Sequence, residues 1–212
     1  MPLHRWFLNL MQAGQIMARA CIANMTDHAS IEFKRTEIGR PYFECDGEPC
    51  KGIDFNISHQ GKYVGLIFAD DGSRVGIDIV DGQEHNNQTW NEFIQPFEIH
   101  VSSLEMDWIL ENDDERYTRF YCLWALKECV VKALGVGISS NLVIHNFKLA
   151  AFDIVGLSRE IEYLMDGQVQ DDWTITISWI DTRHISAIAI NRKNYDVPAP
   201  TFVSWDSIVE ML

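Results

Sequence analysis

Residues 54–69, DFNISHQGKYVGLIFA, and residues 174–190, TITISWIDTRHISAIAI, share one pattern: a strand that ends in Ile-Ser, a short turn and a second apolar strand. In the first strand of each pair, apolar and polar residues alternate, which is typical of a strand with one buried face. Each pair follows a helical stretch and a connecting segment. The echo predicts an α+β fold of two pseudo-symmetric α/β halves, with a ligand site in the cleft between them.

Other segments fill out the two halves. Strands are predicted at 31–35 and 74–80 in the first half and at 142–149 and 159–165 in the second, where short apolar runs are bounded by turn residues. A helix is predicted over 8–25, from apolar residues at helical spacing.

The second half is expected to begin with helices. Ser102 and Glu105 have the spacing of a capping box, and a long helix is predicted to start after Asp113 and Asp114 and to end at Gly135. The polar segment 81–91 marks the boundary between halves. We therefore expect an N-terminal half, a C-terminal half and a C-terminal tail at 1–82, 83–192 and 193–212.

Composition limits the class of protein. The chain has 212 residues and a net charge of −14, which argues against broad nucleic-acid binding because such binding needs a basic surface. We find no apolar run long enough to cross a bilayer and no convincing signal peptide. The sequence therefore predicts a soluble, cytoplasmic protein.

The five cysteines fit a reducing compartment. Cys122 and Cys129 lie inside an apolar helical stretch, so we expect packed free thiols there. Cys45 and Cys50 flank a turn, and two thiols alone are not expected to make a zinc site or a disulfide framework.

Residues 120–137, FYCLWALKECVVKALGVG, form a helix that is apolar on nearly all sides yet carries three charged side chains. Glu128 and Lys132 are four residues apart and share a face, so they form either a surface ion pair or the polar window of a buried site. Lys127 projects from the centre of the apolar face. It either extends outward along its methylene groups or pairs with a carboxylate across the core.

Two strands add polar groups. Asp78 stands mid-strand in RVGIDIV, as either an edge-strand charge or a ligand, and Gly76 beside it indicates a close approach on that face. Ser58, His59 and Gln60 stand where a strand enters a turn, either as ordinary turn residues or as a set of ligands. The sequence contains no glycine-rich phosphate loop.

Taken in order, four segments resemble the 4′-phosphopantetheinyl transferases: GRP at 39–41, FNISHQG at 55–61, VGIDIV at 75–80 and WALKECVVKALGVG at 124–137. The resemblance spans about residues 10–190. It is to the large, monomeric type with two similar α+β halves, and is closest to the cytosolic eukaryotic branch that activates aminoadipate-semialdehyde dehydrogenase. It also implies that the N-terminal half lacks the family's opening strand.

The resemblance implies a Mg²⁺-dependent reaction. Coenzyme A lies in the cleft, a serine of an acyl or peptidyl carrier protein attacks its β-phosphate, phosphopantetheine is transferred and 3′,5′-ADP leaves. Position by position, it implies that Asp78 binds the metal, Glu128 binds the metal and acts as general base, and Lys132 contacts the phosphates. It further implies that the phosphates and nucleotide end of coenzyme A are held by Ser58, His59, Arg35 and Arg40.

Where many relatives have a further glutamate, this chain has Val80, so Gln60 is expected as a neutral third metal ligand. Asn9, Leu10 and Gln15 also stand where the family commonly has basic residues. These departures keep open an alternative, a non-catalytic protein that binds coenzyme A or a carrier. For a carrier, the aromatic segment 90–112 is a candidate docking patch, with packing in the core as the competing explanation.

Overall fold

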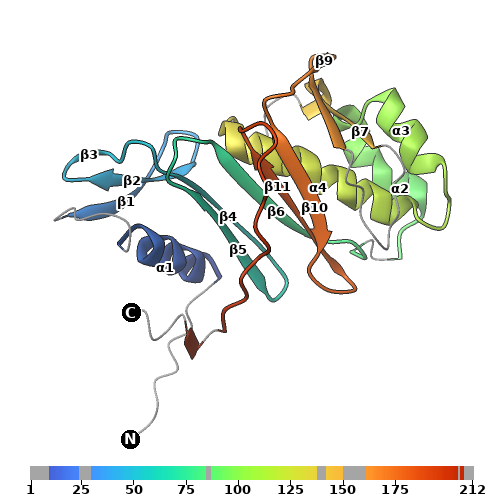
Figure 1. Ribbon diagram of the computed structural model, residues 1–212. Coiled ribbons are helices and arrows are strands. Elements are labelled where there is room, and N and C mark those ends of the chain that lie inside the picture. The colour runs from blue at the N-terminus through green and yellow to red at the C-terminus, as the bar shows by residue number, and fades with distance from the viewer. Residues whose placement is uncertain are drawn as a thin grey trace, which may run out of the picture.

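The computed structural model describes residues 10–23, 30–84, 87–137, 142–149, 161–204 and 206–207. Figure 1 shows an elongated molecule, with α1 and the first strands at one end and the helices α2 and α3 at the other. The strands β6, β11 and β10 lie between them, and α4 packs behind this central sheet.

In its described residues, the first half is one helix followed by six strands. The β1–β2–β3 strands form an antiparallel sheet and β4 and β5 form a hairpin. The bounds are α1 Leu10–Ala23, β1 Ile31–Arg35, β2 Pro41–Cys45, β3 Glu48–Pro49, β4 Asp54–Gln60, β5 Tyr63–Ala69 and β6 Val75–Asp81.

In the described residues, the second half repeats this order after two short α-helices and a 3₁₀ helix. A long helix is followed by a second antiparallel sheet, β7–β8–β9, and by the hairpin β10–β11. The helices are α2 Trp90–Ile94, the 3₁₀ helix η1 Gln95–His100, α3 Ser103–Leu110, α4 Arg116–Leu134 and the 3₁₀ helix η2 Leu142–Ile144. The strands are β7 His145–Leu149, β8 Ile161–Met165, β9 Gln168–Val169, β10 Thr174–Trp179 and β11 His184–Ile190.

Matching turns support the duplication. Asp46-Gly47 joins β2 to β3 and Asp166-Gly167 joins β8 to β9, and all four residues have positive φ, as a tight hairpin turn requires. The expected α+β fold of two pseudo-symmetric halves is therefore confirmed.

The two halves meet at β6. This strand pairs with β11 through an antiparallel backbone ladder in which Asp78 lies opposite Ala187. Its other edge faces β4, where the link is made by side chains: the amides of Val75, Ile77 and Ile79 donate to Asp54, Asn56 and Ser58. Since both sets of residues advance in the same direction, β4 and β6 run parallel, and each pair is separated by 21 residues.

Glycine lets α4 approach β6 closely. A Cβ atom on Gly76 would lie 1.9 Å from the carbonyl oxygen of Cys129 and 2.6 Å from the backbone nitrogen of Ala133. The close approach expected at Gly76 is thus made by the helix itself. It brings the charged side chains of α4 against the polar face of β6.

Lys127 pairs across the core, as one of the two sequence-based alternatives stated. Its Nζ lies 2.9 Å from Glu105, both side chains are 1% exposed, and Nζ also donates to the carbonyl oxygens of Leu142 and His145. Glu105 completes the predicted capping box with Ser102 and accepts a hydrogen bond from the amide of Phe147. One buried pair therefore ties together α3, α4 and the start of β7.

The expectation for Cys45 and Cys50 was wrong, because the two sulfurs form a disulfide across the β2–β3 hairpin. The sequence pattern missed that hairpin, and the hairpin brings the two Cα atoms within 5.1 Å. Cys122 and Cys129 are buried free thiols, as expected. Among the described residues, no helix is both long and apolar enough to cross a membrane.

Candidate active site

Three polar side chains, one each from β4, β6 and α4, meet on the face of β6 that packs against α4. Lys132 of α4 places Nζ 2.5 Å from Oδ1 of Asp78 and 3.0 Å from Oγ of Ser58. The Ser58 hydroxyl lies 3.0 Å from the same Asp78 oxygen and accepts the amide of Ile79. The three residues that sequence reasoning took from separate motifs therefore form one contact group, which we call the Ser58–Asp78–Lys132 triad.

Glu128 lies one helical turn before Lys132 and faces the triad. Its side chain is buried, and Oε1 has no hydrogen-bond partner within the described part of the chain. Burial raises the pKa of Glu128 to about 7, and the nearby Asp78 charge adds to this while Lys132 opposes it. A carboxylate with this pKa can accept and release a proton near neutral pH.

Burial also raises the pKa of Asp78, and Lys132 and Ser58 partly offset that rise. Two neighbouring buried carboxylates with one ammonium group leave the site short of positive charge. An unpartnered carboxylate oxygen in such a place fits a bound cation, and oxygen-only donors suit Mg²⁺. The described residues contain no cluster of three or more His, Cys, Asp or Glu side chains arranged for a metal.

The neighbours of Ser58 on β4 have different environments. His59 is exposed, and strand alternation sends its side chain to the opposite face from Ser58. Gln60 shares the face of Ser58, but its Nε2 donates to Glu84 at 2.8 Å. The structure therefore brings neither side chain into contact with the triad.

The two predicted arginines lie on the β1–β2 side of the triad. Arg40 donates to the backbone oxygen of Lys132 and to both oxygens of Asp54, at 2.7 and 2.6 Å, so its guanidinium links β2, β4 and the end of α4. Arg35 is exposed, donates to the carbonyl oxygen of Gly39 and lies over the ring of Phe33. Arg40 thus holds these elements together, and most of its guanidinium N–H groups already donate to protein oxygens.

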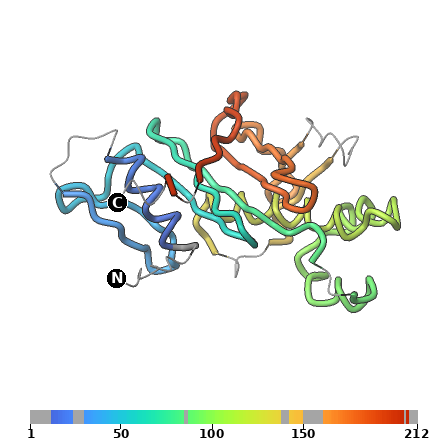
Figure 2. Tube along the Cα trace, turned by 90° about the horizontal axis from the view of Figure 1, so that it is seen from below, coloured from blue at the N-terminus to red at the C-terminus, as the bar shows by residue number. Residues whose placement is uncertain are grey.

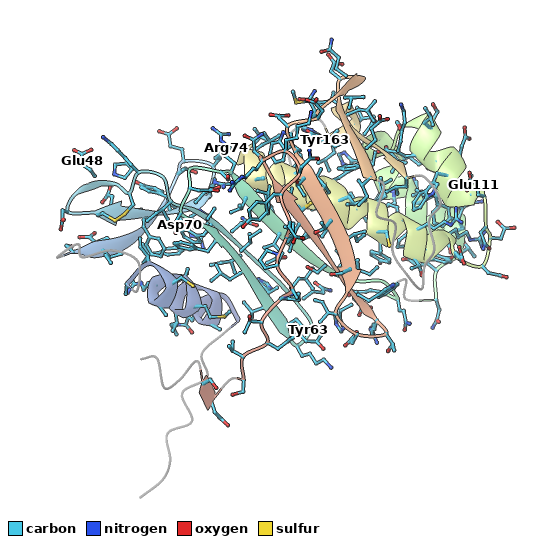
Figure 3. The ribbon with its side chains drawn as sticks, in the orientation of Figure 1. Glu48, Tyr63, Asp70, Arg74, Glu111 and Tyr163 are labelled. Atoms are coloured by element: carbon cyan, nitrogen blue, oxygen red, sulfur yellow. A yellow bond between two sulfur atoms is a disulfide. The ribbon has the colours of Figure 1, made fainter. Side chains whose placement is uncertain are left out.

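Arg74 was missed by the sequence reasoning. It lines a pocket of about 420 Å³ together with Arg40, Thr36, Ser73 and Gly135, where α4 ends. Figure 3 labels it at the end of β6 beside α4. Its side chain is exposed and, among the described residues, donates a single long hydrogen bond of 3.5 Å to the carbonyl oxygen of Leu134. The signal available in the sequence was its place at the start of the VGIDIV strand.

The large side chains of the aromatic segment 90–112 mainly pack against the hydrophobic core. Phe93 is buried, and the other large residues named for the candidate docking patch pack against the same core: Trp90, Phe97, Met106 and Trp108. The exposed apolar residues of this segment are Ile99, Leu104 and Leu110.

Comparison with known proteins gives two family matches. Residues 74–189 match the model of the 4′-phosphopantetheinyl transferase superfamily, and residues 9–70 match that of the 4′-phosphopantetheinyl transferase N-terminal domain. The L-aminoadipate-semialdehyde dehydrogenase-phosphopantetheinyl transferase of Homo sapiens is 31% identical over 198 residues, covering 88% of this chain and 64% of that protein.

A phosphopantetheinyl transferase of Thraustochytrium sp. is 28% identical and covers 91% of this chain and 67% of that protein. The crystal structure of Thermotoga maritima holo-[acyl-carrier-protein] synthase aligns with a TM-score of 0.41 at 19% identity, covering 57% of this chain and 63% of that one. The chain spans 61–64% of the length of its mammalian relatives.

Proposed function

The chain belongs to the 4′-phosphopantetheinyl transferase superfamily, and on that premise we propose that it transfers 4′-phosphopantetheine from coenzyme A to a serine of an apo acyl or peptidyl carrier protein, releasing 3′,5′-ADP. The observation that carries the proposal is the buried Glu128, with its raised pKa and unpartnered oxygen, facing the Ser58–Asp78–Lys132 triad.

In the proposed reaction the serine oxygen of the carrier attacks the β-phosphorus of coenzyme A. A new P–O bond forms to the serine, the P–O bond to 3′,5′-ADP breaks, and the serine proton passes to Glu128. Lys132, whose Nζ contacts Ser58 and Asp78, stabilises negative charge on the phosphate oxygens. Ser58 and His59 are proposed to hold the phosphates, and Arg35 and Arg40 the nucleotide end.

We propose that Asp78 and Glu128 hold a Mg²⁺ ion, which when bound neutralises charge on the diphosphate. Gln60 is proposed as a neutral third ligand, which requires its amide to release Glu84. His59 likewise needs a substrate that reaches around the end of β4, because its side chain is on the other face of that strand.

For the setting of the protein, we propose a cytoplasmic monomer that binds neither nucleic acid nor membrane. The net charge of −14 supports the part of this proposal that concerns nucleic acid, because such binding needs a basic surface. The Cys45–Cys50 disulfide is unusual for a cytosolic protein, so in a reducing compartment we expect the two thiols to be reduced. The expected domains remain 1–82, 83–192 and the tail 193–212.

The transfer assay follows labelled pantetheine from coenzyme A into an apo carrier protein. Wild type is expected to label the carrier. Asp78→Asn is expected to lower the rate by about 10²–10³-fold, because it removes the negative charge that pairs with Lys132 and is proposed to hold the cation. Asp107→Asn, on the exposed face of α3, is the matched control and should keep the wild-type rate.

The alternative, a binding protein without turnover, is favoured by Val80, which is buried in the core and provides no third carboxylate. Calorimetry with coenzyme A separates the two. Binding without transfer to any carrier in a panel would establish the alternative, whereas neither binding nor transfer would overturn both functions.

Arg74→Gln is expected to raise the KM for coenzyme A roughly ten-fold with kcat unchanged, because one charge-assisted hydrogen bond to the nucleotide end is lost. Arg74 is suited to this contact since Arg40, in the same pocket, is engaged with Asp54. Lys193→Gln removes one exposed cation elsewhere and should leave KM unchanged. An unaltered KM in Arg74→Gln would remove Arg74 from the substrate site.

A further inference from the structure

A groove of about 760 Å³ lies on the face of β6 opposite Asp78, and we call it the β5–β10 groove. Its floor is formed by Val75, Ile77 and Ile79, and its walls by β5 on one side and β10–β11 on the other. The outer edge of β5 has no strand beside it in the described structure, since β4–β5 is a two-stranded sheet. The groove thus has an open strand edge beside it, as a further strand would need.

The internal repeat indicates what such a strand would meet. On β4, Asp54, Asn56 and Ser58 accept the alternate amides of β6. The corresponding face of β10 carries Thr174, Thr176 and Ser178, at the same positions in the repeated hairpin. This row of three hydroxyls is the counterpart of the three acceptors on β4.

The first of these hydroxyls is already occupied by the segment that follows β11. The amide of Tyr195 donates to Oγ1 of Thr174 at 2.9 Å, and the two residues are separated by 21 positions, as in the three contacts between β4 and β6. Thr174 in turn donates to the carbonyl oxygen of Arg192, whose guanidinium lies over the Tyr195 ring. Figures 1 and 2 show the segment passing alongside β5 as it leaves β11.

The sequence after Tyr195 fits the same register. Continuing the 21-residue spacing would pair Val197 with Thr176 and Ala199 with Ser178. Among the described residues only the Tyr195–Thr174 contact of this register is made, and the hydroxyls of Thr176 and Ser178 make no hydrogen bond. Successive amides of a strand point to opposite edges, so the amides needed by β10 are those of residues 195, 197 and 199. Pro198 and Pro200 occupy positions whose amides would face β5, so they leave the β10 register intact and prevent a full ladder with β5.

We infer that Tyr195–Ala199 is the counterpart of β6 in the second half: a strap of this same chain that seats in the β5–β10 groove on the hydroxyl row of β10. The residues between Ile190 and Tyr195 form a short connection, which keeps the strap at a high effective concentration beside its groove. Val197 and the segment Pro198–Val203 line the groove already. A seated strap covers the apolar face of β6 and so braces the strand that carries Asp78.

Amide hydrogen exchange of the full chain, followed by NMR, tests the strap. The amides of Tyr195, Val197 and Ala199 are expected to be protected, and that of Asp196 to exchange as an exposed amide does. Thr176→Val keeps the shape of the side chain and removes the acceptor, so protection at Val197 should fall about five-fold. Ser178→Ala should do the same at Ala199 alone.

Thr182→Val, in the exposed β10–β11 turn, is the matched control and should change no exchange rate in the strap. Val197 and Ala199 exchanging as fast as Asp196 in the wild type would overturn the inference. Protection that grows with protein concentration would also overturn it, because a second copy would then supply the strand. Tyr195 protected alone would mean that the register ends at its first contact, which equally contradicts a seated strap.

Discussion

Replacing Glu128 with glutamine is expected to lower kcat for phosphopantetheine transfer by about 10²–10⁴-fold. The amide keeps the size of the side chain but cannot take the serine proton or contribute charge to a cation. The rate of carrier labelling at saturating coenzyme A measures the effect. In wild type the rate should rise with pH up to a plateau above about 7, because Glu128 has its pKa raised to about 7 by burial and must lose its proton to act as base.

The same substitution should stabilise the protein. A raised carboxyl pKa means that the native state binds the proton of Glu128 more tightly than the unfolded chain does. The protonated carboxyl therefore contributes fully to stability at low pH, below its pKa in the unfolded chain. This contribution is lost as pH rises through about 7. Glutamine has no such proton. The free energy of unfolding of Glu128→Gln should therefore exceed that of wild type at pH 8 by about 3 kcal/mol, and the difference should shrink toward pH 4.5.

Urea unfolding at the two pH values measures this difference. Glu48→Gln in the exposed β2–β3 hairpin serves as control and should change neither activity nor the pH dependence of stability. A Glu128→Gln variant that is active, or one that is less stable than wild type at pH 8, would contradict the role given to this carboxylate.

Lys127→Met is expected to lower the free energy of unfolding by about 3–5 kcal/mol, because it leaves the buried carboxylate of Glu105 without its counter-ion. The thioether chain fills much of the space of the lysine but donates nothing to Leu142 or His145. Chemical denaturation measures the loss. Although Lys127 is next to Glu128 in the sequence, its side chain contacts Glu105 and not the triad. The folded fraction of Lys127→Met should therefore retain measurable transfer activity.

A double-mutant cycle isolates the pair. Glu105→Gln removes the charge and keeps one acceptor oxygen for the amide of either Ser102 or Phe147, so Lys127→Met combined with Glu105→Gln should be less destabilised than the sum of the single variants. Lys148→Met breaks the exposed pair of Lys148 with Glu162 and should cost only about 0–1 kcal/mol. Equal effects of Lys127→Met and Lys148→Met would refute the buried ion pair.

Much of the fold followed from local patterns. The strand at 31–35 has the bounds that the sequence predicted, the strand pairs predicted within 54–69 and 174–190 both form, and the helix that carries Glu128 ends at Gly135 as expected. The C-cap is recoverable from sequence because Gly135 adopts a left-handed conformation, with φ 70°, which few other residues accept. The strand at 41–45 was missed because it begins at Pro41, a residue that is typical of turns and loops.

The candidate site was only partly predictable. The contacts among Ser58, Asp78 and Lys132 join residues 20 to 74 positions apart, and periodicity says nothing about which faces meet. Likewise, the partner of Lys127 lies 22 positions away, across the core. Arg74 could not be found from pattern because its role depends on the shape of a pocket formed by four separate segments.

The contact between β4 and β6 is made by side chains, and this affects how the protein can change during evolution. A backbone ladder is the same whatever the sequence, whereas this joint depends on the identity of Asp54, Asn56 and Ser58. Its strength can therefore be altered in single genetic steps. Divergence at these three codons could loosen or tighten the contact between β4 and β6 while every strand keeps its ladder, so evolution can adjust how the β4–β5 hairpin packs on β6 separately from the fold.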